Sequence, residues 1–149
     1  STMHRTVRDI LIPQDNVTMP PDASAATAAA TMTERGVGSI LIVNETRELI
    51  GIFTERDLMC RVLVDGRDAH TTTLAEVMST ELFTTTPETT LGTLLAAMQE
   101  RHIRHAPVLE DGAILAQISL RDLLRALLAD RTADLTALRS YVSGSEAGI

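Results

Sequence analysis

Two Ser/Thr-x-x-Asp motifs, each placed directly after an apolar run, are the residues of this sequence best suited to chemistry. Thr54 precedes Asp57 by three positions, and Ser119 precedes Asp122 by the same spacing. After each Asp the apolar residues recur with helical spacing, which predicts a strand that runs directly into a helix. Such a junction places a hydroxyl and a carboxylate beside free backbone N–H groups, an arrangement that suits a ribose and a phosphate.

The same spacing is also that of a helix capping box, with Asp in place of the usual Glu or Gln. Taken singly, each motif favours the cap. The motifs recur, however, within a longer repeat in which Pro21-Asp22 matches Pro87-Glu88 and Met32 matches Met98. A local cap does not require its neighbours to recur, so the repeat favours a shared function.

The repeated unit resembles the cystathionine beta-synthase (CBS) domain, which occurs in tandem pairs that bind adenosine-containing ligands. The resemblance covers about residues 7–129, and its most specific segment is the run from Gly51 to Asp57. The second copy differs from the family pattern: Ala116 stands where the family has Gly, and Gln117 where it has an apolar residue. Close backbone approach of a ligand is easiest at Gly.

The resemblance implies an α/β fold of two tandem CBS units, each with helix-strand-strand-helix order and small mixed sheets, packed around a pseudo-twofold axis. We expect the first unit at 7–64 and the second at 74–129, with a polar linker at 65–73. A short helix and a tail are expected at 130–149.

Local signals place the elements within each unit. Asp22 is a good N-cap for the first long helix, and Gly36 closes it. A short extended segment is expected at 16–19 and a short strand at 83–85. The remaining pattern predicts helices at 24–35, 55–63, 87–101 and 120–128, and strands at 39–43, 49–53, 106–109 and 114–119.

The resemblance also implies a cleft between the units that takes AMP, ADP, ATP, NAD or S-adenosylmethionine. Asp57 and Asp122 are expected to hold the ribose hydroxyls, and Thr54 and Ser119 the phosphate. The base or the phosphate is expected near a further set of residues: Val37, Gly38, Ile103 and Arg104.

Two basic clusters are candidates for a phosphate contact: Arg56 and Arg121 beside the two aspartates, and His102, Arg104 and His105 after the predicted helix 87–101. The alternative is that the arginines face solvent and the histidines cap helix carbonyls. No third ligand with suitable spacing accompanies the two histidines, so no metal site is expected.

The resemblance implies a regulatory ligand sensor. No enzyme is expected, because the sequence has no nucleophile elbow or Walker loop, and no general base is placed to activate the hydroxyl of either motif. A second interpretation is a structural or partner-interaction module that binds no small molecule. The broad apolar faces of the predicted helices 55–63 and 120–128 favour a symmetric homodimer.

Composition restricts the partners and the location of the protein. The net charge of -7 and the pI near 5.0 oppose general binding to nucleic acid. The apolar runs are shorter than the roughly 20 residues that a bilayer requires, and no signal peptide is recognisable. We therefore expect no membrane association and a cytoplasmic location.

Overall fold

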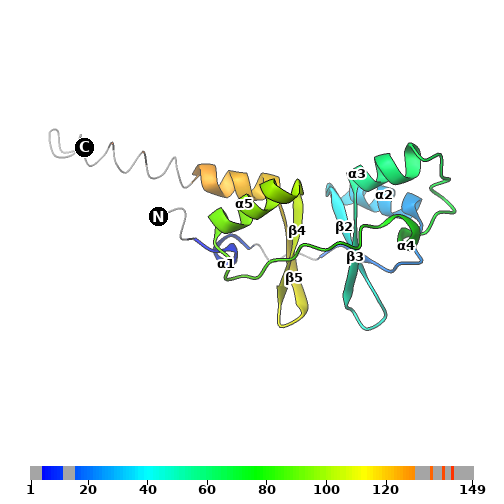
Figure 1. Cartoon of the computed structure of the whole chain (residues 1–149), viewed down its shortest axis with the longest axis horizontal. Coiled ribbons are helices and arrows are strands. Elements are labelled where there is room, and N and C mark those ends of the chain that lie inside the picture. Colours follow the sequence, from blue (N-terminus) through cyan, green and yellow to red (C-terminus); the bar gives the residue numbers. More distant parts are fainter. Residues whose placement is uncertain (1–4, 12–15, 130–134, 136–138, 140–141, 143–149) are drawn as a thin grey trace.

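The computed structural model describes residues 5–11, 16–129, 135, 139 and 142 (Figure 1). These residues form two α/β units that lie side by side, each with a small sheet and helices packed against it. Each unit has its own apolar core. The predicted fold class is therefore confirmed. No helix in these ranges is long and apolar enough to cross a membrane.

The sheet of the first unit is mixed and has the order β1-β2-β3. β1 (Thr18–Met19) pairs in parallel with β2 (Ser39–Val43), which pairs antiparallel with β3 (Leu49–Thr54). Ile40 and Phe53 are fully buried against the helices. Ile40 and Phe53 are paired directly across the two strands, so their side chains lie on the same face of the sheet, which packs into the core.

The long helix of this unit, α2 (Ala25–Arg35), is capped at both ends by the residues around it. Ser24 Oγ accepts a hydrogen bond from the Thr27 N–H at 3.1 Å. Gly36 ends the helix in the left-handed conformation, with φ 64°. The prediction of Asp22 as N-cap is wrong, because Ser24 makes the cap and the helix begins one residue later.

Strand β3 runs directly into a helical segment, as its sequence predicts. The first turn is α3 (Glu55–Asp57), and the next turns, η2 (Leu58–Leu63), have the wider π-helical spacing. The Val64 N–H donates to the Met59 carbonyl, five residues back, at 2.9 Å. The predicted helix at 55–63 is thus present, with a geometry that the apolar pattern did not indicate.

In the second unit, α5 (Leu91–Arg101) precedes the antiparallel pair β4 (His105–Glu110) and β5 (Ala113–Ser119). Residues 120–129 form the helix that follows β5.

The strand predicted at 83–85 is wrong, because Thr85 forms only a single parallel bridge to Val108. The next bonds of a parallel ladder would need N–H groups from Pro107 and Pro87, and proline has none.

Two short helices are exchanged between the units. α1 (Val7–Ile10) packs in the core of the second unit, and the Val7 N–H donates to the Thr89 carbonyl at 2.9 Å. α4 (Leu74–Val77) packs in the core of the first unit. Figure 1 shows α1 beside α5 and α4 on the side of α2 and α3. Each unit is therefore completed in space by a helix from the other stretch of sequence.

Candidate functional site

The first Ser/Thr-x-x-Asp motif forms a complete capping box where β3 meets α3. Thr54 Oγ1 accepts from the Asp57 N–H at 3.1 Å, and the Asp57 carboxylate accepts from the Thr54 N–H at 3.0 Å. Asp57 is only 7% exposed. These are the contacts that the capping alternative predicts.

The segment after α4 covers the space next to Asp57. Ser79 donates its hydroxyl to the Asp57 carboxylate at 3.2 Å, and its backbone forms a bridge with Ile52. A Cβ atom placed on Gly51 would lie 2.4 Å from Met78 Sδ. The close approach that Gly51 permits is therefore made by Met78 of the same chain.

The second motif forms only half of a capping box. Ser119 Oγ accepts from the Asp122 N–H at 3.0 Å. The Asp122 carboxylate makes no hydrogen bond or ion pair with any residue that the structure describes, and Asp122 is exposed. Its two oxygens are thus available to hydroxyl donors from outside the protein.

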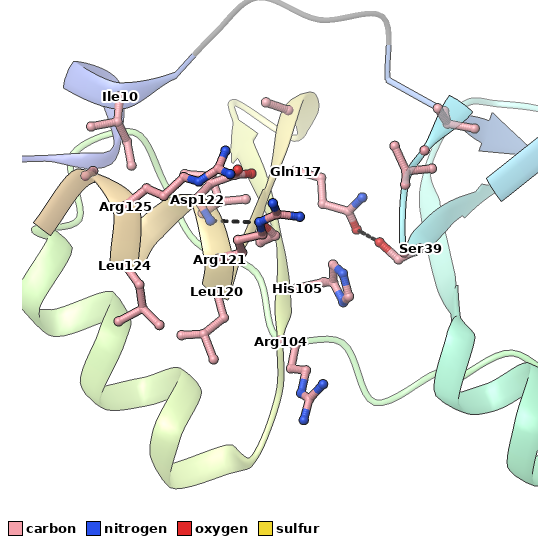
Figure 2. A pocket seen from close by; sticks show the side chains of 18 of the residues that line it. Ile10, Ser39, Arg104, His105, Gln117, Leu120, Arg121, Asp122, Leu124 and Arg125 are labelled. Atoms are coloured by element: carbon pink, nitrogen blue, oxygen red, sulfur yellow. Dashed lines mark hydrogen bonds between the residues drawn. The ribbon is translucent and has the colours of Figure 1, made fainter. Parts of the chain in front are cut away.

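Asp122 lines a cavity of about 1220 Å³ formed by residues of both units (Figure 2). Arg56 and Ile103 line a second, smaller cavity of about 370 Å³, to which Arg104 also contributes. Thr54 and Asp57 line neither cavity. The larger cavity brings together seven of the predicted site residues: Val37, Gly38, Arg104, His105, Ser119, Arg121 and Asp122.

A side-chain hydrogen bond crosses this cavity from one unit to the other. Ser39, fully buried on β2, donates its hydroxyl to Gln117 Oε1 on β5 at 2.5 Å (Figure 2). Asn16 adds a second link, since its amide donates to the Leu115 carbonyl at 3.1 Å. Sequence analysis did not assign Ser39 or Asn16 to the site. The polar Gln117 at an otherwise apolar position was the available signal.

His105 lies where β2, α3 and β4 meet. A Cβ atom on Gly38 would lie 3.1 Å from His105 Nε2 and 3.3 Å from Glu55 Oε1, so a side chain at position 38 would crowd both groups. Burial lowers the pKa of His105 below its ordinary value. Glu55 opposes this shift, Arg104 adds to it, and Asp122 opposes it.

Arginine side chains dominate the electrostatics of the larger cavity. Sequence analysis identified Arg104 and Arg121 but missed Arg35, in the last turn of α2, and Arg125. Arg125 follows Arg121 by four residues, so their side chains share one face of the helix. That spacing was a usable signal. A cavity lined by several arginines suits an anion. Among the described residues, no group of three or more His, Cys, Asp or Glu is placed to hold a metal ion.

Comparison with known proteins identifies one family. The model of the CBS domain matches residues 7–63 and 74–129. The chain is 33% identical over 127 residues to the mitochondrial CBS domain-containing protein CBSX3 of Arabidopsis thaliana, covering 83% of this chain and 62% of that relative. It is also 33% identical over 118 residues to the CBS domain-containing protein YhcV of Bacillus subtilis, covering 79% and 82% of the two chains.

The solved structures include a CBS-domain containing protein from Agrobacterium tumefaciens. It superposes with a TM-score of 0.78 at 30% identity, over 83% of this chain and 94% of that one. This chain therefore spans most of that structure but less than two thirds of the plant relative.

Proposed function

The chain belongs to the CBS domain family, whose members are regulatory modules, and we propose that it binds an adenosine-containing ligand in the cavity beside Asp122. The observation that carries the proposal is the exposed carboxylate of Asp122, free of hydrogen bonds to the described residues, at the wall of a cavity built by both units. An ionised carboxylate accepts one hydrogen bond from each of the two neighbouring hydroxyls of a ribose.

Further lining residues support the same ligand class. In this proposal Ser119 and His105 contact the phosphate, and the adenine lies against Val37 and the backbone of Gly38. With two Phe, one Tyr and no Trp in the chain, aliphatic side chains and backbone groups replace aromatic stacking. AMP, ADP, ATP, NAD and S-adenosylmethionine all carry the adenosine that this arrangement suits.

We propose one ligand for each chain. Met78 and Ser79 cover the junction at Asp57, and the hydrogen bonds of its carboxylate are made within the protein. Sequence analysis assigned Thr54 and Asp57 to an equivalent first site; in this proposal they cap the helix instead. In the proposed function the chain acts as a regulator that responds to ligand concentration and catalyses no reaction.

Thermal unfolding in the presence of adenosine ligands tests this proposal. A ligand at about 100 times its Kd should stabilise the folded state by about 2.7 kcal/mol and raise the melting temperature. Asp122→Asn should at least halve this shift, because a tenfold weaker Kd leaves about 1.4 kcal/mol of stabilisation at the same ligand concentration. Asp111→Asn, which makes the same change in the exposed turn between β4 and β5, should retain it. Absence of a shift with every adenosine ligand would contradict the proposal and favour a partner-interaction module.

We also propose a homodimer formed through the helices after β3 and β5. Met59 and Leu63 are 53% and 75% exposed on one helix, and Leu124 is 40% exposed on the other. These apolar faces are narrower than predicted, because Val62 and Leu123 are buried in the cores.

Sedimentation tests the dimer. The wild type should sediment as a dimer at micromolar concentration, and Leu124→Glu should shift it to the monomer, since a buried unpaired charge opposes association. Leu127 packs against the core of the second unit and is unsuitable for this test. A monomeric wild type, or a Leu124→Glu variant that remains dimeric, would contradict this interface.

A further inference from the structure

We propose that the cavity beside Asp122 selects its ligand by phosphate charge, and binds an adenosine di- or triphosphate in preference to AMP, adenosine or S-adenosylmethionine. This inference rests on the proposed adenosine site and adds the class of ligand that the site takes. It is carried by the positions, charges and partners of the arginines in the cavity wall, which are Arg35, Arg104, Arg121 and Arg125.

The cavity has the opposite charge to the rest of the molecule. The chain has a formal net charge of -7. In the cavity wall, however, four arginines stand against two carboxylates, Glu55 and Asp122. Positively charged groups that cluster in a concave surface focus the electric field there and attract anions. The local excess of positive charge therefore favours a ligand with several negative charges.

Four of the described arginines outside the cavity, Arg8, Arg61, Arg67 and Arg101, interact with other side chains. Arg8 lies 2.8 Å from Glu88, Arg61 lies 3.6 Å from Asp57, and Arg101 stacks on an aromatic ring. None of the four cavity arginines forms an ion pair with a residue of the described ranges. Their guanidinium groups retain the full set of donors that phosphate oxygens accept.

The four arginines approach the cavity from both units. Arg35 comes from the end of α2 in the first unit, and Arg104 immediately precedes β4 in the second. Arg121 and Arg125 project from successive turns of the helix at 120–129. Like charges that line one cavity repel one another, and a polyphosphate that binds among them reduces the repulsion.

The wall also offers a path for a phosphate chain. Arg104 lines both cavities, and the smaller one adds Arg56 and His102 with no carboxylate in its lining. Figure 2 shows the Arg104 guanidinium pointing away from Gln117 and Ser39, beyond His105. With the ribose at Asp122, the phosphates extend along His105 toward Arg104.

S-adenosylmethionine has the wrong charge for this wall. It carries a sulfonium and an ammonium group against a single carboxylate, so it brings net positive charge to a cavity with an excess of arginine. Adenosine brings no charge, and AMP brings one phosphate to a wall with four guanidinium groups. Affinity is therefore expected to rise with each added phosphate.

Isothermal titration calorimetry on the full chain in EDTA buffer tests the order of affinity. The titrants are ATP, ADP, AMP, adenosine, S-adenosylmethionine and inorganic tripolyphosphate. We expect affinity to increase about threefold to tenfold for each phosphate, the gain expected from charge-assisted hydrogen bonds at a partly exposed site. Arg104→Gln should weaken ATP about tenfold and change adenosine less than twofold. Arg47→Gln, in the exposed turn between β2 and β3, is the matched control and should change neither.

The outcomes separate this inference from the proposed function. Adenosine or S-adenosylmethionine binding as tightly as ATP would overturn the charge selection and leave the adenosine site intact. Equal losses for ATP and adenosine in Arg104→Gln would also overturn it. Binding of tripolyphosphate but of no adenosine ligand would overturn the adenosine site on which the inference rests, while binding that strengthens from adenosine through AMP and ADP to ATP supports both.

Discussion

Asp57 accepts hydrogen bonds from the Thr54 N–H and the Ser79 hydroxyl and is 7% exposed, whereas Asp122 is exposed at the edge of a cavity. Both aspartates end the same motif, at the same kind of strand-to-helix junction. At the first junction the segment after α4 contacts both Asp57 and Gly51. A shared motif therefore places a carboxylate but does not determine whether that carboxylate is available to a ligand.

Two positions beside the junctions differ between the copies. Gly51 has no side chain, which leaves room for Met78 to pack directly on β3. At the second junction Ala116 carries a methyl group, and Leu11, the counterpart of Met78 in the repeat, lines the cavity. The copy that matches the family pattern better, with Gly51, is thus the covered one.

The largest expected change in the free energy of unfolding comes from adding a side chain at Gly51, beside the first junction. The Cβ of Gly51→Ala would lie 2.4 Å from Met78 Sδ, so we expect a loss of about 1–3 kcal/mol in the free energy of unfolding. In a Met78→Ala background the same change should cost nothing further, which urea denaturation of the four proteins would measure. The reciprocal Ala116→Gly should cost about 0.5–1 kcal/mol. An equal cost of Gly51→Ala in both backgrounds would contradict the contact.

A smaller change in stability is expected from removing the hydrogen bond between Ser39 and Gln117, which connects the two units. Gln117→Ile introduces the residue found at the matching position of the first copy, Ile52, and leaves the buried Ser39 hydroxyl without its acceptor. We expect a loss of about 1 kcal/mol in the free energy of unfolding. Adding Ser39→Ala should recover part of it, because both polar groups are then removed. Stability that falls further in the double variant would show that the pair is not coupled in this way.

The smallest expected effect is the pH dependence from His105, whose counterpart in the first copy is Ser39. Because burial lowers the pKa of His105 from its ordinary value of 6.5, the unfolded chain binds more protons than the folded chain below that pH. The contribution of His105 is fully present above pH 6.5 and is lost as pH falls through the lowered pKa. Urea denaturation between about pH 5 and 7.5 should therefore give a shallower pH dependence for His105→Gln than for the wild type. The same slope in both proteins would contradict this role.

The sequence predicted the repeat, the α/β class and the positions of most strands, because apolar periodicity is retained in both copies. It did not predict the exchange of α1 and α4, which depends on which core each short helix reaches in space. The absent strand at 83–85 was predictable in principle, since Pro87 and Pro107 lack the N–H groups that would extend the ladder. The apolar pattern alone did not indicate that this strand would be absent.

Sequence analysis named seven of the residues that line the candidate site. It did not indicate which of the two Ser/Thr-x-x-Asp motifs has the exposed carboxylate. Ser119, Asp122 and His105 line one cavity. The contacts of Ser79 with Asp57 and of Met78 with Gly51 were not predictable, because both depend on the path of the chain after α4. Side-chain contacts from distant segments, and not the motif, distinguish the two junctions.

The most direct test of this account compares Asp57→Ala with Asp122→Ala, by melting temperature and by calorimetric affinity on the same samples. Asp57→Ala should lower the free energy of unfolding by about 1–3 kcal/mol, through loss of the cap and of buried hydrogen bonds, and leave affinity within about twofold. Asp122→Ala should weaken the adenosine ligand roughly tenfold or more and abolish the preference for ribose over 2′-deoxyribose, with little change in stability. The reverse pattern, in which Asp57→Ala abolishes binding and Asp122→Ala leaves both affinity and ribose preference unchanged, would contradict the account.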